Sequence, residues 1–165
     1  MVKKHPRTFK NVPPYERMEI ERKWAMPDKR TFDIKPIRKL IERHHISVTE
    51  WIDPFPYPYK KDALEYLSEF KDNSVEGILF DPPYSPRQLK EMYGGIGLAY
   101  NTKSSYWSNI KNEIARIMKK DGIVISFGWN SMGIGKTRGF KIEEILLVPH
   151  GGNHNDTICV VEIKK

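Results

Sequence analysis

The sequence contains a single cysteine, Cys159, in 165 residues. One thiol cannot form an internal disulfide or supply a cysteine cluster for a metal, which excludes thiol redox chemistry and zinc-finger folds. No apolar run approaches the roughly 20 residues that a membrane-spanning helix needs. The basic start MVKKHPRTFK is not followed by the apolar region of a signal peptide. We therefore expect an intracellular, cytoplasmic protein with no membrane anchor and no metal site.

The residues that are present suit one folded domain. Hydrophobic residues make up 39% of the chain, charged residues 30% and aromatic residues 12%, with a mean hydropathy of −0.60. This composition is typical neither of disordered chains nor of membrane proteins. The length is sufficient for one hydrophobic core. We divide the chain into a basic N-terminal arm, residues 1–30, and a folded domain, residues 31–165.

Positive charge is concentrated at the two ends of the sequence. The chain carries 28 Lys and Arg against 21 Asp and Glu, a formal net charge of +7. Residues 1–30 contribute +5, residues 31–80 contribute −2 and residues 81–165 contribute +4. Such a distribution suits a polyanionic partner, but basic surfaces without a nucleic-acid partner are common. Charge alone therefore leaves both interpretations open.

Apolar periodicity predicts helices that alternate with strands. The stripe of isoleucine and leucine in IKPIRKLIERHH is typical of a helix, and Asp62 is placed to cap the next one. The expected helices span 34–45, 62–70 and 104–121, and the expected strands span 46–55, 75–80, 122–129, 140–148 and 156–164. In the arm we expect extended chain with a short helix around residues 15–24. Residues 85–103 are polar and glycine-containing, which favours a mobile loop.

This order of elements predicts an α/β fold with one sheet covered on both faces. We expect the sheet to be mostly parallel. The last two strands, 140–148 and 156–164, are close enough in sequence to form an antiparallel hairpin at its edge.

The strand predicted over Val75–Phe80 runs directly into Asp81, Pro82, Pro83 and Tyr84. Ligands of open α/β sheets bind at the carboxyl ends of the strands. Two prolines stiffen the turn and leave the Pro82 carbonyl without a sheet partner. Asp81 adds a carboxylate and Tyr84 a flat aromatic face, which together suit a planar base with an exocyclic amine.

A carboxylate and a carbonyl can accept both N–H hydrogens of such an amine. Accepting both pushes the nitrogen towards tetrahedral geometry, so that its lone pair can attack an electrophile without a strong base. The simpler alternative is a Pro-Pro turn that closes the strand, with Asp81 as a helix cap. The apolar strand immediately before the motif favours the chemical interpretation.

Asp-Pro-Pro-Tyr after a strand resembles the hallmark of S-adenosylmethionine-dependent amino-methyltransferases that act on adenine in DNA. The sequence as a whole is similar to small, phage-type adenine-specific DNA methyltransferases, over about residues 20–165. Phe32–Leu40 is similar to the helix-opening motif beside the methionine end of the cofactor. Ile52–Phe55 resembles the start of the cofactor loop, and Asp62–Leu64 the segment whose acidic residue meets the cofactor's adenine. The stretches 77–90 and 104–162 also resemble this family.

The resemblance implies a single-domain, Rossmann-like methyltransferase sheet over 31–165, with S-adenosylmethionine as cofactor and DNA as partner. It also implies phage encoding and no metal. The resemblance also implies that Asp81 and the Pro82 carbonyl orient the amine, that Pro83 fixes the turn and that Tyr84 stacks on the base. The residues expected around the cofactor are Phe32, Lys35, Pro36, Asp53, Pro54, Phe55, Asp62 and Ala63. Those expected to bind the substrate are Ser85, Arg87, Lys136 and Arg138.

The sequence departs from the family in two places. A glycine-bearing loop, a helix and a second strand normally follow the first strand, but only eight residues separate Asp53 from Asp62. Either the cofactor site is reduced or residues are missing between Phe55 and Asp62, and we favour missing residues. No separate target-recognition domain is visible either. Sequence specificity is then expected from the arm, from residues 85–103 or from a second subunit in a homodimer, or it is weak.

Gly133–Thr137 resembles the end of a phosphate-binding P-loop. That motif requires glycine at position 130, which is Asn130, and a long helix afterwards. A strand-like segment follows instead, so we interpret this stretch as a basic loop with Lys136 and Arg138 near substrate phosphates.

Several other residue types admit two interpretations. His150 and His154 are better explained as hydrogen-bonded loop histidines than as metal ligands. Trp129 and Asn130 are evenly balanced between packing and substrate contact. We assign Trp107 to the core stripe of its helix and Cys159 to an apolar strand.

Other functions remain open at this stage. An RNA or protein amino-methyltransferase could use the same motif, and a non-catalytic nucleic-acid-binding protein could keep the fold without the cofactor loop. The sequence does not reveal the recognised DNA site, and it favours adenine over cytosine only through the family resemblance.

Overall fold

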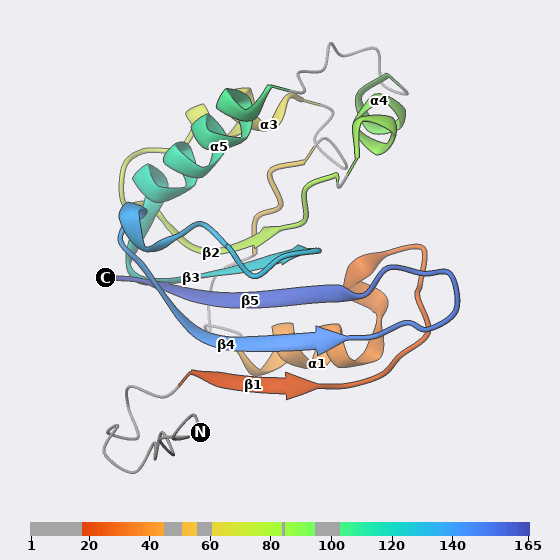
Figure 1. Ribbon diagram of the computed structural model, residues 1–165. Coiled ribbons are helices and arrows are strands. Elements are labelled where there is room, and N and C mark those ends of the chain that lie inside the picture. The colour runs from red at the N-terminus through yellow and green to blue at the C-terminus, as the bar shows by residue number, and fades with distance from the viewer. Residues whose placement is uncertain (1–17, 45–50, 56–60, 84, 95–102) are drawn as a thin grey trace, which may run out of the picture.

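The computed structural model describes residues 18–44, 51–55, 61–83, 85–94 and 103–165 (Figure 1). A five-stranded sheet runs through this part of the chain in the order β1-β4-β5-β3-β2. Its strands are β1 (Glu19–Arg22), β2 (Val75–Phe80), β3 (Met118–Gly128), β4 (Phe140–Val148) and β5 (Thr157–Lys164). The α-helices are α1 (Lys35–Arg43), α3 (Ala63–Ser68), α4 (Pro86–Gly94) and α5 (Ser104–Ile117), and the short 3-10 helices are η3 (Thr31–Asp33) and η4 (Lys136–Arg138). The fold is therefore α/β, as the sequence predicted.

The sheet is mixed rather than mostly parallel, which corrects our expectation. β1 pairs with β4 and β2 with β3 in parallel, whereas β5 is antiparallel to both β3 and β4. The antiparallel β4–β5 hairpin is confirmed, but it does not form the edge that we expected. β5 lies inside the sheet because Cys159, Val160 and Val161 are all buried and need cover on both faces.

One edge of the sheet is β1, in the segment that we predicted to be an arm. Residues 19–22 form a strand, so the short helix expected around residues 15–24 is wrong for these residues. The free edge of β4 offers backbone groups that β1 pairs with, and the N–H of Lys23 continues the pairing by donating to Leu147 O at 2.9 Å. Tertiary pairing has overridden local propensity here. The division of the chain at residue 30 stays a prediction.

Two of the predicted helices are confirmed with their start signals. α1 begins with Pro36 in its first turn, where a missing N–H costs nothing, and buries Ile37 and Leu40. α3 begins after Asp62, whose Oδ1 accepts from the N–H groups of Leu64 and Glu65 at 2.9 and 3.2 Å.

Two boundaries differ from the prediction. Residues 86–94 of the expected loop form α4, because Leu89 and Tyr93, four residues apart, are both fully covered. The Ser85 hydroxyl accepts from the N–H of Gln88 at 3.2 Å and helps to begin this helix. α5 ends at Ile117, and β3 already begins at Met118, where the helix was expected to continue.

The core has one cluster on each face of the sheet. α3 and α5 cover one face, where Ile78, Phe80 and Val124 pack against Ile110 and Ile114. α1 covers the other face, on which Ile125 and Phe127 are buried (Figure 1). Beyond β2, Ile52 forms a single parallel bridge with Ile78. Among the described residues, no helix is long and apolar enough to cross a membrane.

Candidate functional site

The Asp-Pro-Pro segment leaves the sheet at the carboxyl end of β2. β2 and β3 are parallel, and Phe80 is paired in register with Ser126. The residues after Phe80 and those after Ser126 therefore leave the sheet at the same edge. This is where ligands of open α/β sheets bind.

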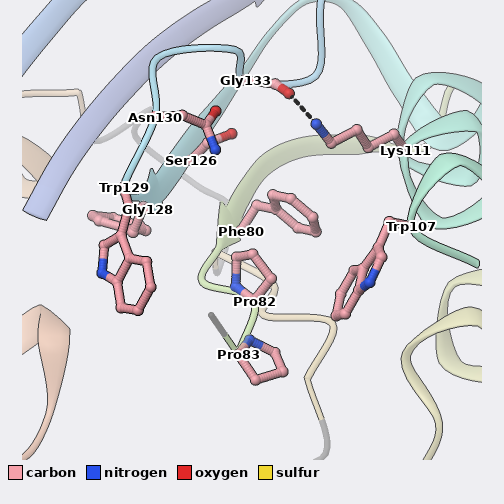
Figure 2. A pocket seen from close by; sticks show the side chains of 11 residues that line it. Phe80, Pro82, Pro83, Trp107, Lys111, Ser126, Gly128, Trp129, Asn130 and Gly133 are labelled. Atoms are coloured by element: carbon pink, nitrogen blue, oxygen red, sulfur yellow. Dashed lines mark hydrogen bonds between the residues drawn. The ribbon is translucent and has the colours of Figure 1, made fainter. Parts of the chain in front are cut away.

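A cavity of about 240 Å³ lies at this edge (Figure 2). Its lining comes from the end of β2, from β3 and the loop after it, and from α5. The lining residues are Phe80, Pro82, Pro83, Trp107, Lys111, Ser126, Phe127, Gly128, Trp129, Asn130 and Gly133. The structure thus brings the predicted Pro82 and Pro83 together with Trp129 and Asn130. Tyr84 lies outside the described residues.

Aromatic rings form much of the cavity wall. Trp107 packs edge-on against Tyr106 at 5.4 Å between ring centroids, and it also faces the cavity. Trp129 is 49% exposed, far more than a core tryptophan. In Figure 2, Pro82 and Pro83 lie between the two indoles. Such a wall suits a flat, largely apolar ligand. Sequence analysis placed Trp107 only in the core and so missed its second face.

The loop after β3 is held in place by a buried carboxylate. Glu162 on β5 is fully buried, and its two oxygens accept from the N–H groups of Ile134 at 2.6 Å and Gly135 at 3.0 Å. Burial raises the pKa of Glu162, although these two hydrogen bonds lower it. The Lys111 amine donates to the Gly133 carbonyl at 2.6 Å. The loop that closes one end of the cavity is therefore fixed from β5 and from α5.

Lys111, Ser126 and Glu162 were not among the residues predicted from the sequence. Lys111 stands four residues after Trp107, so the two share one helix face. Ser126 and Glu162 each interrupt an apolar strand. A polar residue inside an apolar run could have indicated a specific role for these two positions, because a buried polar group needs a hydrogen-bond partner.

Asp53 and Asp81 leave the same edge of the sheet: Asp53 follows the Ile52 bridge to β2, and Asp81 directly follows β2. The Oδ1 atom of Asp53 accepts from the N–H of Phe55 at 3.0 Å. Burial raises the pKa of Asp53 to about 7, and the negative charge of Asp81 adds to the rise. No ion pair joins Asp53 to a lysine or arginine of the described residues. Above about pH 7 the Asp53 carboxylate therefore carries a negative charge that a cationic ligand would neutralise.

Asp62 is engaged in a buried polar network. Besides capping α3, it accepts through Oδ2 from the Tyr106 hydroxyl. The hydroxyl groups of Tyr106 and Tyr93 lie 3.2 Å apart, and the Tyr93 hydroxyl accepts from the Ala63 N–H at 3.2 Å. Burial raises the pKa of both tyrosines, so they remain neutral donors. The network ties α3, α4 and α5 together, and the cofactor role of Asp62 and Ala63 stays a prediction.

The other residues predicted to bind the cofactor divide into two groups. Phe55 and Pro54 are buried, and Phe55 packs against both Phe80 and Trp107 of the cavity, with centroids at 5.7 and 6.3 Å. Phe32 contacts Phe127, another lining residue, at 5.2 Å. Lys35 and Pro36 instead line a separate groove of about 430 Å³, together with Glu21, Lys23, Trp24, Lys39 and Arg43.

The residues predicted to bind the substrate are spread over two elements. Ser85 directly precedes α4, and the exposed Arg87 lies in its first turn, where Arg87 Nε pairs with Glu91 at 2.7 Å. Lys136 is exposed in η4. Arg138 is held against α5 by Asn112 Oδ1 at 2.8 Å and Ser108 Oγ at 2.9 Å. Their contact with a substrate stays a prediction.

Two of the alternatives weighed in the sequence are settled by the structure. η4 spans only Lys136–Arg138 and leads into β4, so the long helix of a P-loop does not follow Gly133–Thr137. His150 is buried, with Nδ1 at 2.8 Å from Ala25 O and Nε2 at 2.9 Å from Thr157 Oγ1, which confirms it as a hydrogen-bonded loop histidine. His154 is exposed. Among the described residues, no group of three or more His, Cys, Asp or Glu could hold a metal ion.

Comparison with known proteins gives one significant relative among curated proteins. No family model matches the sequence. In an alignment 91 positions long that covers 49% of this chain, the sequence is 33% identical to the Escherichia coli (strain K12) protein named "Putative methylase YubD". The chain spans only 37% of the length of that protein. The solved structure of PH0851 covers 87% of this chain at 14% identity with a TM-score of 0.38, and the match spans 36% of PH0851. A score this low does not establish a shared fold.

Proposed function

We propose that this chain transfers a methyl group from S-adenosylmethionine to the exocyclic N6 amine of adenine in DNA. One observation carries the proposal: Asp81 and Pro82 leave β2 at the carboxyl edge of the sheet, where Pro82 and Pro83 line a cavity walled by Trp107 and Trp129. The name of the Escherichia coli relative supports methyl transfer in general. The choice of adenine and of DNA rests on the Asp-Pro-Pro-Tyr motif and on the net charge of +7.

The chain's own residues would act mainly by placing the amine. The Asp81 carboxylate and the Pro82 carbonyl accept its two hydrogens, so that the nitrogen lone pair points away from both acceptors. Pro83 has a fixed φ, and the turn therefore keeps the carbonyl in position without the entropy loss that a flexible residue would have. Holding two reactants in line supplies most of the acceleration in such a reaction.

The charges at the site fit the proposed cofactor. S-adenosylmethionine, when bound, supplies a methyl group on a cationic sulfonium, which is a strong electrophile. Asp53 and Asp81 provide carboxylates that would hold this positive charge, and the aromatic ring of Phe55, two residues after Asp53, packs against Phe80, the residue before Asp81. Both oxygens of Asp62 already accept hydrogen bonds within the chain. The residues of the chain therefore match the cofactor best at its positively charged sulfonium group.

DNA would approach this edge with its target base extruded from the stack. A duplex adenine cannot reach a cavity at a sheet edge unless it flips out. The exposed cations Arg87 and Lys136 lie on the two segments α4 and η4, and we propose that they contact backbone phosphates. Phosphate contacts would hold the distorted strand without reading its sequence.

The direct test is methyl transfer from labelled S-adenosylmethionine by the purified 19.4 kDa chain. Unmethylated duplex DNA, RNA and protein are offered side by side, and the modified nucleoside is identified. We expect incorporation into DNA as N6-methyladenine. Incorporation into RNA, protein or cytosine would replace the proposed substrate. No incorporation and no calorimetric binding of S-adenosylmethionine, with an intact mass that matches the sequence, would indicate a nucleic-acid-binding protein instead.

The raised pKa of Asp53 predicts a pH-dependent affinity for the cofactor. Below about pH 7 Asp53 is largely protonated, and above it the carboxylate is charged. Binding of the cationic cofactor should therefore tighten as pH rises through about 7, and this change should be smaller in Asp53→Asn. Calorimetric titration of both proteins at several pH values measures it. Equal pH dependence in the two proteins would contradict the assignment.

The same group makes a prediction for stability with the opposite sign. In the unfolded chain Asp53 ionises near its ordinary pKa of 3.8, whereas in the folded chain it keeps its proton to about pH 7. The folded state binds more protons in this window, so the free energy of unfolding falls as pH rises from about 4 to about 7. Asp53→Asn should remove this decrease and unfold at a higher temperature than the wild type above about pH 7. Thermal unfolding monitored by circular dichroism measures the difference.

A further inference from the structure

Ser126 occupies a position on β3 where the core would normally place an apolar side chain. It is paired in register with Phe80 on β2 and with Val160 on β5, both of which are buried. Side chains of register partners stand on the same face of a sheet. Ser126 therefore points to the face covered by α5, and it is only 7% exposed.

The Ser126 hydroxyl has no hydrogen-bond partner among the described residues. A buried hydroxyl can both donate and accept, and most buried polar side chains in proteins are paired. Lys111 of α5 lines the same cavity, and its amine donates to the Gly133 carbonyl. Ser126 lines the same cavity as Pro82 and Pro83 (Figure 2). Ser126, with its buried and unused hydroxyl, is thus one of the residues that form the wall of the proposed site.

The remaining wall restricts what this hydroxyl could bind. Phe80, Trp107 and the two prolines are apolar and suit the faces of a flat ring. A cavity of about 150 Å³ accommodates benzene, so one of about 240 Å³ has room for a larger ring system. The ligand that matches is a heterocycle with apolar faces and hydrogen-bonding atoms along its edge.

We propose that the Ser126 hydroxyl donates a hydrogen bond to a ring nitrogen of the target base and so contributes to base specificity. This inference rests on the proposed function, since the base is placed by its amine at Asp81 and Pro82. In adenine, the ring nitrogens nearest the amine are N1, which is bonded to the carbon that carries the amine, and N7, which lies on the other side of that carbon and one atom further away. Ser126 lies on β3, next to β2, which ends at Phe80 directly before Asp81, and we therefore assign one of these two nitrogens as its partner.

The test pairs a change in the protein with a change in the base. Once the target adenine of the wild type has been mapped, duplexes are made with 1-deazaadenine or 7-deazaadenine at that position. Ser126→Ala should lower kcat/KM for the natural duplex about tenfold, as loss of one hydrogen bond to a buried group does. For one of the two deaza duplexes, in contrast, Ser126→Ala should cause no further loss. Ser131→Ala, at an exposed serine outside the cavity lining, is the matched control and should behave as the wild type.

Stability distinguishes this role from a structural one. Because the hydroxyl has no described partner, Ser126→Ala should unfold at the same temperature as the wild type or higher. A lowered unfolding temperature with unchanged kcat/KM would overturn the inference. The inference would also be overturned if Ser126→Ala lowered kcat/KM on both deaza duplexes as much as it does on the natural duplex. If the wild type methylates DNA but Ser126→Ala does not behave as expected on the natural and deaza duplexes, the proposed function stands and the role of Ser126 falls. If the wild type neither methylates nor binds DNA, both proposals fall.

Discussion

Replacing Asp81 with asparagine should reduce methyl transfer by about a hundredfold or more, which is the usual effect of removing one preorganised electrostatic contact to a reacting group. The amide keeps the shape of the carboxylate and one accepting oxygen, but it is neutral and its NH2 group can only donate, so it is a weaker acceptor for the substrate amine. Asp81→Ala removes the acceptor altogether and should abolish transfer. Initial rates with labelled S-adenosylmethionine measure both variants.

The fold should survive either change, and this separates a catalytic role from a structural one. The charge of Asp81 raises the pKa of Asp53, so removing it relieves repulsion between the two carboxylates. The unfolding temperature at neutral pH should therefore not fall. Asp121→Asn is a suitable control: Asp121 is exposed at the irregular start of β3, with φ of 62°, a conformation that asparagine also adopts. An Asp81 variant as active as this control would refute the assigned role.

The segments predicted correctly are those whose signals are local. The apolar run Val75–Phe80, the proline in the first turn of α1 and the cap at Asp62 each lie within a few residues of the element that they specify. The Asp-Pro-Pro segment at the end of β2 follows from that same run. These parts of the fold and site could be read from the sequence because they depend on neighbours in the chain.

The parts that were missed depend on contacts between distant residues. α4 has a polar, glycine-containing sequence, but Tyr93 reaches Ala63, 30 residues away, and the hydroxyl of Tyr106. β1 exists because β4 offers it an edge more than 100 residues later in the sequence. The position of β5 inside the sheet likewise follows from pairing with β3 as well as β4. No local pattern specifies such pairings.

The loop after β3 is the clearest case of this dependence, and it predicts the largest change in stability. Glu162 lies 28 residues from Ile134, yet it satisfies the N–H groups of both Ile134 and Gly135. Glu162→Ala would leave both groups unpaired and open a cavity in the sheet. Each buried unpaired group costs about 1–3 kcal/mol, so we expect the free energy of unfolding to fall by about 3 kcal/mol or more.

Urea unfolding followed by circular dichroism measures this loss. Glu143→Ala is the matched control, because Glu143 lies only partly buried on β4, with Lys141 at 3.2 Å and Lys165 at 3.6 Å. Surface pairs of this kind contribute up to about 1 kcal/mol, so the control should lose little. Equal losses in the two variants would show that Glu162 does not hold the loop.

The same carboxylate explains why the loop carries glycine at position 133. Gly133 has φ of 55°, and a Cβ there would lie 2.2 Å from Glu162 Oε2. Gly133→Ala should therefore also destabilise the chain, through a clash with the group that Glu162→Ala removes. In the double variant this clash is absent. The loss of unfolding free energy in the double variant should therefore be smaller than the sum of the losses in the two single variants. Strict additivity would mean that the loop and β5 are not coupled, and that the end of the cavity is set by α5 and Lys111 alone.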